Sequence, residues 1–320
     1  MITKEAKEKE SYIRRMHFTS SAREGCFHLL NNLQFQEGEK ILLPSYIGIT
    51  DKEGSGVFDP IIESGIAFDF YKLNKNLSID MEDFERKLSK GGYRVALVIH
   101  YFGFLQNDID LVVNICKEYG AYLLEDCAHT FSSRFNGKLL GEFGDFSFNS
   151  IHKIIATQDG GILRINNGQI KLPEIGDNEK VKMETLEYLY KTDMELVSRA
   201  RVRNYRYLLN SLKGQGLSQI EIMYPVLNEG IVPLNFPIIV KNGNREELYF
   251  QLIDNGVITT SLYYRMIKSI NPKEFPISYQ ISNSILNLPI HQDITLSDLD
   301  IIASVLKKIN TGLELGMSDA

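Results

Sequence analysis

Residues 123–129 read Leu123-Leu124-Glu125-Asp126-Cys127-Ala128-His129, an apolar run that leads into two carboxylates and a histidine. Residues 94–100 form a second apolar run, and we interpret residues 108–119 between them as a helix. Strands that are almost continuously apolar are typical of a sheet covered on both faces. We therefore expect a βαβ unit with parallel strands and a right-handed crossover. Ligands gather at the carboxyl ends of such strands, where Asp126 and His129 would lie near residues 100–103.

Short apolar strands and helices alternate along most of the remaining chain of 320 residues. We predict strands at residues 40–43, 65–71, 143–149, 161–165, 236–240 and 257–261. We predict helices at residues 4–16, 23–33, 80–88, 184–212, 245–255 and 297–309. The alternation predicts an α/β fold, and the mixed tail predicts a smaller α+β domain. We expect a large domain over residues 1–199, which begins with a charged helical arm, and a small domain over residues 200–320.

The next informative stretch is Gly144-Asp145-Phe146-Ser147-Phe148-Asn149-Ser150-Ile151-His152-Lys153, which is followed by Asp159-Gly160-Gly161. It combines a hydroxyl-rich approach with a lysine, downstream of the acid at a strand end. Chemistry based on pyridoxal phosphate (PLP) needs this combination. Lys153 would form an imine with the cofactor aldehyde. Asp126 would keep the pyridine nitrogen protonated, so that the ring acts as an electron sink.

Five segments together resemble the fold-type I PLP enzymes, and specifically the sugar aminotransferase family of the DegT/StrS type, of which this chain would be a shortened member. The segments are Ser21-Ala22-Arg23-Glu24, residues 37–46, residues 124–129, residues 144–161, and residues 287–291 with 295–300. The resemblance covers most of the chain. It implies a three-layer α/β/α large domain with a mostly parallel sheet, and a homodimer as the assembly.

The resemblance also implies roles for individual residues. Lys153, Asp126 and His129 would be catalytic, with His129 beside the cofactor ring or bonded to its 3-hydroxyl. Once the substrate amine displaces Lys153, the freed amine would move the proton between Cα and C4′. The cofactor-binding set would be Ser21, Ala22, Arg23, Tyr46, Asp126, His129, Ser147, Ser150 and Lys153. Residues 21–23 would bind the phosphate at a helix N-terminus, with a hydroxyl from Ser147 or Ser150.

The activity that the resemblance implies is a PLP-dependent amino-group transfer. An amino acid such as glutamate would leave its amine on the cofactor, and a keto sugar, linked to a nucleotide, would then take it. Such a ping-pong reaction belongs to sugar biosynthesis, as in the making of polysaccharides or antigens.

Two alternatives remain open. Counting seven residues forward from Lys153 reaches Gly160, the family's usual spacing, whereas counting five forward from Ser147 reaches His152. A branch of the family with histidine at the catalytic position is a sugar dehydratase. A catalytically degenerate binding or regulatory protein is the other alternative. In its favour, residues 166–183 lack the family's Asn-Tyr-Arg loop, Gly48 replaces an aromatic residue, and Asn204-Tyr205-Arg206 falls within a predicted helix.

Composition excludes several other classes of protein. A net charge of −6 without a strong basic patch argues against nucleic acid or an anionic membrane as the main partner. The three cysteines form no Cys-Xaa-Xaa-Cys pair, and residues 1–10 lack the apolar core of a signal peptide, so we expect a cytoplasmic protein with reduced thiols. The histidines outside the motif have no metal-site spacing, so we expect no metal. We interpret the arginines at 199–206 as a solvated helix face.

Overall fold

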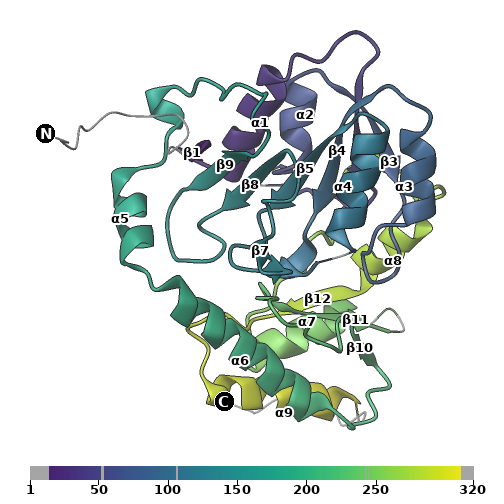
Figure 1. Cartoon of the computed structure of the whole chain (residues 1–320). Helices are drawn as coiled ribbons and strands as arrows, with labels where there is room; N and C mark the ends of the chain where they lie inside the picture. Colours follow the sequence, from purple (N-terminus) through teal and green to yellow (C-terminus); the bar gives the residue numbers. More distant parts are fainter. Residues whose placement is uncertain (1–13, 52–53, 106, 242, 244, 311–320) are drawn as a thin grey trace, which may run out of the picture.

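A seven-stranded sheet forms the centre of the molecule, as seen in the computed structural model, which describes residues 14–51, 54–105, 107–241, 243 and 245–310 (Figure 1). The strand order is β1-β9-β8-β5-β4-β2-β3. Strands β3, β2, β4, β5 and β8 are parallel to one another. At one edge, β9 pairs antiparallel with β8, and β1 pairs antiparallel with β9. The bounds are β1 Met16–Thr19, β2 Lys40–Pro44, β3 Ala67–Tyr71, β4 Tyr93–Ile99, β5 Tyr122–Cys127, β8 Phe146–Ser150 and β9 Gly161–Ile165.

Helices pack on this sheet and connect its parallel strands. α1 packs on β8 and β9, and α4 packs on β5. The helices of this part are α1 Ala22–Asn32, α2 Phe58–Glu63, α3 Met81–Leu88, α4 Ile109–Glu118 and α5 Met183–Lys191. Short elements in the connections are η2 Tyr101–Gly103, β6 Arg134–Phe135, β7 Lys138–Leu139 and η3 Asp177–Glu179. The α/β fold with a mostly parallel sheet is therefore confirmed.

The predicted βαβ unit is present as β4, α4 and β5. The two strands run parallel, with Ile99 opposite Asp126. Six of the seven residues of β4 are buried, which explains the continuous apolar run. Asp108 begins α4 by accepting hydrogen bonds from the N–H groups of Asp110 and Leu111. The register places Asp126 at the carboxyl end of its strand, where α/β sheets bind ligands.

A second, smaller sheet lies beyond this end of the large one (Figure 1). It is antiparallel, in the order β10-β11-β12, and α7 and α8 pack against it. A backbone hydrogen bond of 2.7 Å from the N–H of Leu234 to the carbonyl of Phe102 joins the two regions. The bounds are α6 Met194–Leu212, β10 Ile220–Ile222, β11 Phe236–Val240, α7 Arg245–Asp254, α8 Pro276–Ser284, β12 Ile285–Leu288 and α9 Leu296–Asn310.

Several expectations were wrong in detail. Residues 184–212 form two helices rather than one, because Asp193 caps a new helix by accepting hydrogen bonds from the N–H groups of Glu195 and Leu196. Residues 257–261 form only an isolated bridge, at Thr260, instead of a strand. The predicted helical arm at 4–16 lies outside the described residues up to 13, and Met16 already belongs to β1. A domain boundary at residues 199 and 200 stays a prediction and would fall inside α6.

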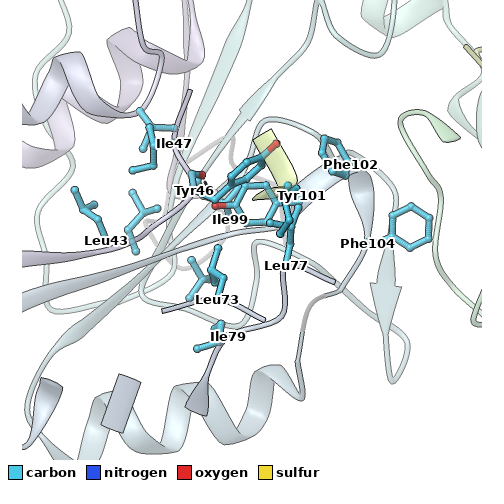
Figure 2. Packing of buried hydrophobic residues seen from close by; sticks show 14 of the residues in the cluster. Leu43, Tyr46, Ile47, Leu73, Leu77, Ile79, Ile99, Tyr101, Phe102 and Phe104 are labelled. Carbon is cyan, nitrogen blue, oxygen red and sulfur yellow. Dashed lines mark hydrogen bonds between the residues drawn. The ribbon is translucent and has the colours of Figure 1, made fainter. Parts of the chain in front are cut away.

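The core beneath the carboxyl ends of the strands is aromatic. Tyr46 and Tyr101 lie side by side among the aliphatic residues of Figure 2, with ring centroids 5.5 Å apart in an edge-to-face arrangement. The Tyr101 hydroxyl donates a 2.6 Å hydrogen bond to the Tyr46 carbonyl, so the polar end of this buried ring is satisfied. This buried, hydrogen-bonded layer supports the residues that follow the carboxyl ends of the strands.

Buried polar side chains of α6 tie the smaller region to the rest. The Asn204 amide donates to the carbonyls of Ile290, His291 and Ile294 at 3.3, 2.9 and 3.3 Å. Arg201 is buried too, and burial lowers its pKa to about 10. The interpretation of residues 199–206 as a solvated face is therefore wrong at Arg201. None of the helices in the described part of the chain has the length and apolar character that a membrane span requires.

Replacing Asn204 by alanine removes the donor shared by these three carbonyls. We expect the Asn204→Ala variant to lose about 1–3 kcal/mol of unfolding free energy, because buried acceptors without a donor keep their desolvation penalty. Thermal melting measures this as a drop of a few degrees relative to the natural chain.

The matched control is Arg199→Ala, which breaks only the exposed Arg199–Glu195 pair on the same helix. Exposed pairs contribute about 0–1 kcal/mol, so its melting temperature should barely change. Equal melting of the two variants would contradict the assigned role of Asn204.

Candidate active site

A cavity of about 620 Å³ opens at the carboxyl ends of β5 and β8. Its walls are the first residues of α1, residues 48–50 and 54–57, the turn at 150–158 and the segment 261–264. Asp126, His129 and Lys153 all line it. The structure therefore brings together residues that lie more than a hundred positions apart in the chain, and the volume suits a small-molecule cofactor with its substrate.

Asp126 is a buried carboxylate at the base of the cavity. Its Oδ1 accepts a 2.8 Å hydrogen bond from the N–H of Ala128. Burial raises its pKa to about 6, although this hydrogen bond and the charge of Lys153 act in the opposite direction. A carboxylate in this state is poised to pair with a cation that enters the cavity.

His129 is held as a neutral ring. The N–H of Phe102 donates a 3.2 Å hydrogen bond to its Nδ1, and the Phe102 ring stacks on the imidazole at 5.8 Å with an interplanar angle of 12°. Burial lowers the pKa of His129 well below its usual value, and the nearby charge of Lys153 adds to the effect. With Nδ1 as acceptor, the ring proton is on Nε2, so His129 is a hydrogen-bond donor through that atom.

Glu125 supports the site from the other side of the strand. Its carboxylate accepts from the N–H groups of Gly141, Phe143 and Gly144 at 2.6–2.8 Å and lies 2.9 Å from His100 Nε2. Burial raises its pKa, but these hydrogen bonds outweigh burial and the net shift is downward. The Glu125 carboxylate thus holds residues 141–144 in place. Asp126 is the acid of this pair that lines the cavity.

Lys153 lies on a short turn directly after β8. Ile151, Ile154 and Ile155 of this turn are buried, whereas His152 and Lys153 are exposed toward the cavity. The Ile154 carbonyl accepts hydrogen bonds from Arg201 at 3.2 Å and from Gln292 Nε2 at 3.0 Å. Arg201 and Gln292 therefore hold the backbone of the turn, and the side chains of His152 and Lys153 line the cavity.

The N-terminus of α1 forms the far wall. The Ser21 Oγ caps the helix by accepting from the N–H of Glu24 at 3.1 Å. Gly161 lets this turn lie directly on β9, because a Cβ there would be 2.3 Å from the Ser21 carbonyl carbon. The first N–H groups of a helix have no partner within it and carry a partial positive charge. Together with Ser150, which also lines the cavity, they suit a phosphate group.

Two candidates from the sequence do not line the cavity. Ser147 pairs with Glu125 in the sheet, on the face opposite Asp126, and its buried hydroxyl lies near Gly141 without a hydrogen-bond partner among the described residues. Tyr46 is completely buried and donates from its hydroxyl to the Leu262 carbonyl at 3.3 Å. Alternation along β8 explains the first difference, and the packing of a distant segment over Tyr46 explains the second.

Sequence reasoning missed the segment 261–264 and residues 48–50 and 54–57 as walls of the cavity. The signal that was available is Gly48, a glycine that leaves room for another part of the chain. Among the residues that the structure describes, the fold also gathers two sets of potential metal ligands that the spacing of histidines did not indicate. They are Glu24 with His28 and Glu179, and His100 with Glu125 and Cys127. The second set is the hydrogen-bonded support described above.

The chemistry of the donors fits PLP. The cavity offers an amine for the aldehyde, a buried carboxylate for the ring nitrogen and a helix N-terminus for the phosphate. These are the three recognition elements that the cofactor requires. The residues that would hold PLP are therefore Lys153, Asp126, His129, Ser150 and the turn at 21–23.

Comparisons with known proteins agree with this chemistry. The chain is 28% identical over 146 residues to GDP-perosamine synthase of Vibrio cholerae, which is 44% of this chain and 38% of that enzyme. It is 25% identical over 291 residues to a UDP-4-amino-4,6-dideoxy-N-acetyl-beta-L-altrosamine transaminase of Campylobacter jejuni, which covers 78% and 76% of the two chains.

A solved structure shows the same fold. The PLP form of Spr1654 from Streptococcus pneumoniae superimposes with a TM-score of 0.76 over 93% of this chain and 87% of that one, at 14% identity. The description of the DegT/DnrJ/EryC1/StrS aminotransferase family matches residues 12–173, just over half of the sequence. The chain belongs to this family of PLP-dependent aminotransferases.

Proposed function

We propose that the chain is a PLP-dependent aminotransferase that moves an amino group from an amino-acid donor such as glutamate to a keto sugar linked to a nucleotide. The observation that carries the proposal is that the Asp126 carboxylate and the Lys153 amine line one cavity beside the N-terminus of α1. The relatives named above, a perosamine synthase and a nucleotide-sugar transaminase, support the class of substrate.

Each residue then has a physical task. When bound, PLP supplies an electron-accepting ring that stabilises negative charge on the carbon that carries the amine. Asp126 would hold the ring nitrogen in its charged form through an ion pair. His129 would donate a hydrogen bond from Nε2 to the cofactor. Ser21, Ala22 and Arg23, with the Ser150 hydroxyl, bind the phosphate at the helix N-terminus.

Lys153 has two successive tasks. Its Nζ would hold the cofactor aldehyde covalently until the amine of the donor takes its place. The free Nζ would then act as the base that removes the proton from the α-carbon of the donor, and as the acid that returns a proton to the carbon that receives the amine in the keto sugar. The anchoring of Ile154 by Arg201 and Gln292 keeps the amine on the same side of the cavity throughout.

The proposal includes a homodimer in the cytoplasm. Lys153 is exposed and the cavity is open in the single chain, so a second copy beside it would exclude water from the reacting atoms. Cys26, Cys116 and Cys127 are free, buried thiols, which suits a reducing compartment.

His152 favours one second candidate, a PLP-dependent sugar dehydratase. The imidazole lines the same cavity, and its Nδ1 lies 3.3 Å from the Ser150 hydroxyl. If His152 occupied the catalytic position, no covalent bond between the chain and the cofactor would form, and the two candidates therefore differ in a measurable covalent linkage.

Borohydride reduction of the PLP-loaded protein distinguishes these candidates. We expect mass spectrometry of the digested protein to place the pyridoxyl label on Lys153. Lys153→Ala should carry no label and lose at least about 100-fold in the rate of amine transfer, because the proton carrier is removed. His152→Ala, the adjacent control on the same turn, should keep the label. A label elsewhere, or loss of label in His152→Ala alone, would refute the assignment.

The raised pKa of Asp126 predicts a specific pH dependence for the protein without cofactor. The folded pKa is about 6, against about 3.9 in an unfolded chain, so the unfolded state binds fewer protons between these values. Stability from this group therefore falls as pH rises from about 4 to 6, by about 3 kcal/mol in total. The melting temperature of Asp126→Asn should equal that of the natural chain below pH 4 and exceed it above pH 6.

Added PLP should reverse this order, because the cofactor stabilises the natural chain through the charge that asparagine lacks. Asp254→Asn, which removes an exposed carboxylate at the end of α7, is the control for a change of net charge. If Asp126→Asn gained no stability above pH 6, the carboxyl group would not be a desolvated acid.

A further inference from the structure

One wall of the cavity comes from a segment that no motif indicates. Tyr263 lies there with Asp126 and His129, and its ring centroid is 5.7 Å from that of His129 at an interplanar angle of 35°. Two buried rings pack against it in edge-to-face arrangements: Tyr46 at 5.3 Å and 77°, and Tyr101 at 6.1 Å and 90°. Figure 2 shows these two supporting tyrosines at the strand ends. The Tyr263 ring is thus fixed in orientation at the edge of the site.

Gly48 is the reason that the ring fits. A Cβ at Gly48 would lie 2.2 Å from Tyr263 Cδ1 and 2.7 Å from its Cα, which no real side chain allows. The φ of Gly48 is not in the left-handed region, so the glycine is not needed for its backbone conformation. It is needed because the backbone and the ring of Tyr263 occupy the space where a side chain would be.

The segment is clamped to the loop at 47–49 in spite of strain. Tyr263 has φ of +61°, a conformation that costs a non-glycine residue about 1 kcal/mol or more. Two hydrogen bonds hold the residues that follow it, from the N–H of Ile49 to the Arg265 carbonyl at 2.9 Å and from the N–H of Ile267 to the Ile47 carbonyl at 3.1 Å. The Ser282 hydroxyl donates to the Tyr263 carbonyl at 2.8 Å. Strain that is kept in place this firmly clusters at ligand sites.

We infer that Tyr263, whose ring occupies the space that Gly48 leaves open, supplies the aromatic surface against which the pyridine ring of PLP binds. The inference rests on the proposed function. A ring held positively charged by Asp126 is attracted to the face of a neutral aromatic side chain. Burial raises the pKa of Tyr263 above its usual range, and the charge of Asp126 adds to this, so the phenol is neutral. Tyr263 is thereby a positioning residue for the cofactor, contributed by a part of the chain far from the lysine motif.

The test measures cofactor binding rather than activity. The dissociation constant of PLP comes from absorbance titration, and the circular dichroism of the bound cofactor reports how rigidly its ring is held. Tyr263→Phe keeps the ring and should bind within about twofold of the natural chain. Tyr263→Ala and Tyr263→Leu should bind about 10-fold to 100-fold more weakly, the range found when stacked aromatic rings are removed from heterocycles. Both should also lose most of the induced circular dichroism.

Glycine variants test the same contact from the other side. Gly48→Ala should weaken binding and dichroism as Tyr263→Ala does, because the methyl group displaces the tyrosine. Gly168→Ala is the matched control outside the cavity, since its φ is not in the left-handed region and its added Cβ meets only Arg15 Nη1, at 3.9 Å. Melting of each apoprotein shows that the variants fold.

The outcomes separate the inference from the function on which it rests. If the natural chain binds no PLP, the proposed function fails. If it binds PLP and both Tyr263→Ala and Tyr263→Leu bind equally well, only the role of Tyr263 fails. A loss in Tyr263→Phe as large as in Tyr263→Ala would assign the effect to the hydroxyl and overturn the stacking role as well.

Discussion

A single buried carboxylate organises the site. Asp126 is desolvated at the carboxyl end of β5, and its pKa is raised to about 6 because the surrounding protein offsets the cost of burying its charge only in part. Its neighbour Glu125, equally buried, is compensated by three backbone N–H groups and His100. The two adjacent acids thus differ in what they contact. Glu125 binds the backbone of the fold, and Asp126 faces the cavity, because side chains alternate between the two faces of a strand.

The apolar βαβ unit and the helix at 22–32 could be predicted from sequence, because their signals are local. Continuous apolar runs and a capping serine determine those elements almost independently of the rest of the chain. The break between α5 and α6 was missed although Asp193 is a strong cap, because the periodic pattern runs on through it. The short strands β1 and β10 depend on pairing with distant residues, which a linear pattern does not record.

The candidate site divides in the same way. Asp126, His129, Lys153 and the turn at 21–23 follow from motifs, and the structure places all of them on one cavity. Ser147 did not follow, because choosing between two serines on one strand requires knowing which face is open. Tyr46, predicted to bind the cofactor, lies outside the cavity, whereas Tyr263 lines it, for a similar reason. The chain fills the space beside Gly48 from a segment more than two hundred residues away, and only tertiary structure reveals that choice.

The region after α5 therefore contributes to the site as well as to stability. Arg201 and Gln292 hold the carbonyl next to Lys153, and the segment 261–264 forms the opposite wall. Such an arrangement couples the position of the amine to the packing of α6 and its neighbours. Substitutions in this region would change cofactor binding by shifting the backbone beside Lys153, although they lie outside the motifs that identify the family.

Nitrogen-15 NMR of the protein loaded with ring-labelled PLP tests the central claim most directly. The account predicts a protonated pyridine nitrogen that stays protonated well above neutral pH in the natural chain and loses its proton at lower pH in Asp126→Asn. An unprotonated nitrogen at neutral pH in the natural chain would contradict the assignment of Asp126, and with it the chemistry assigned to this cavity.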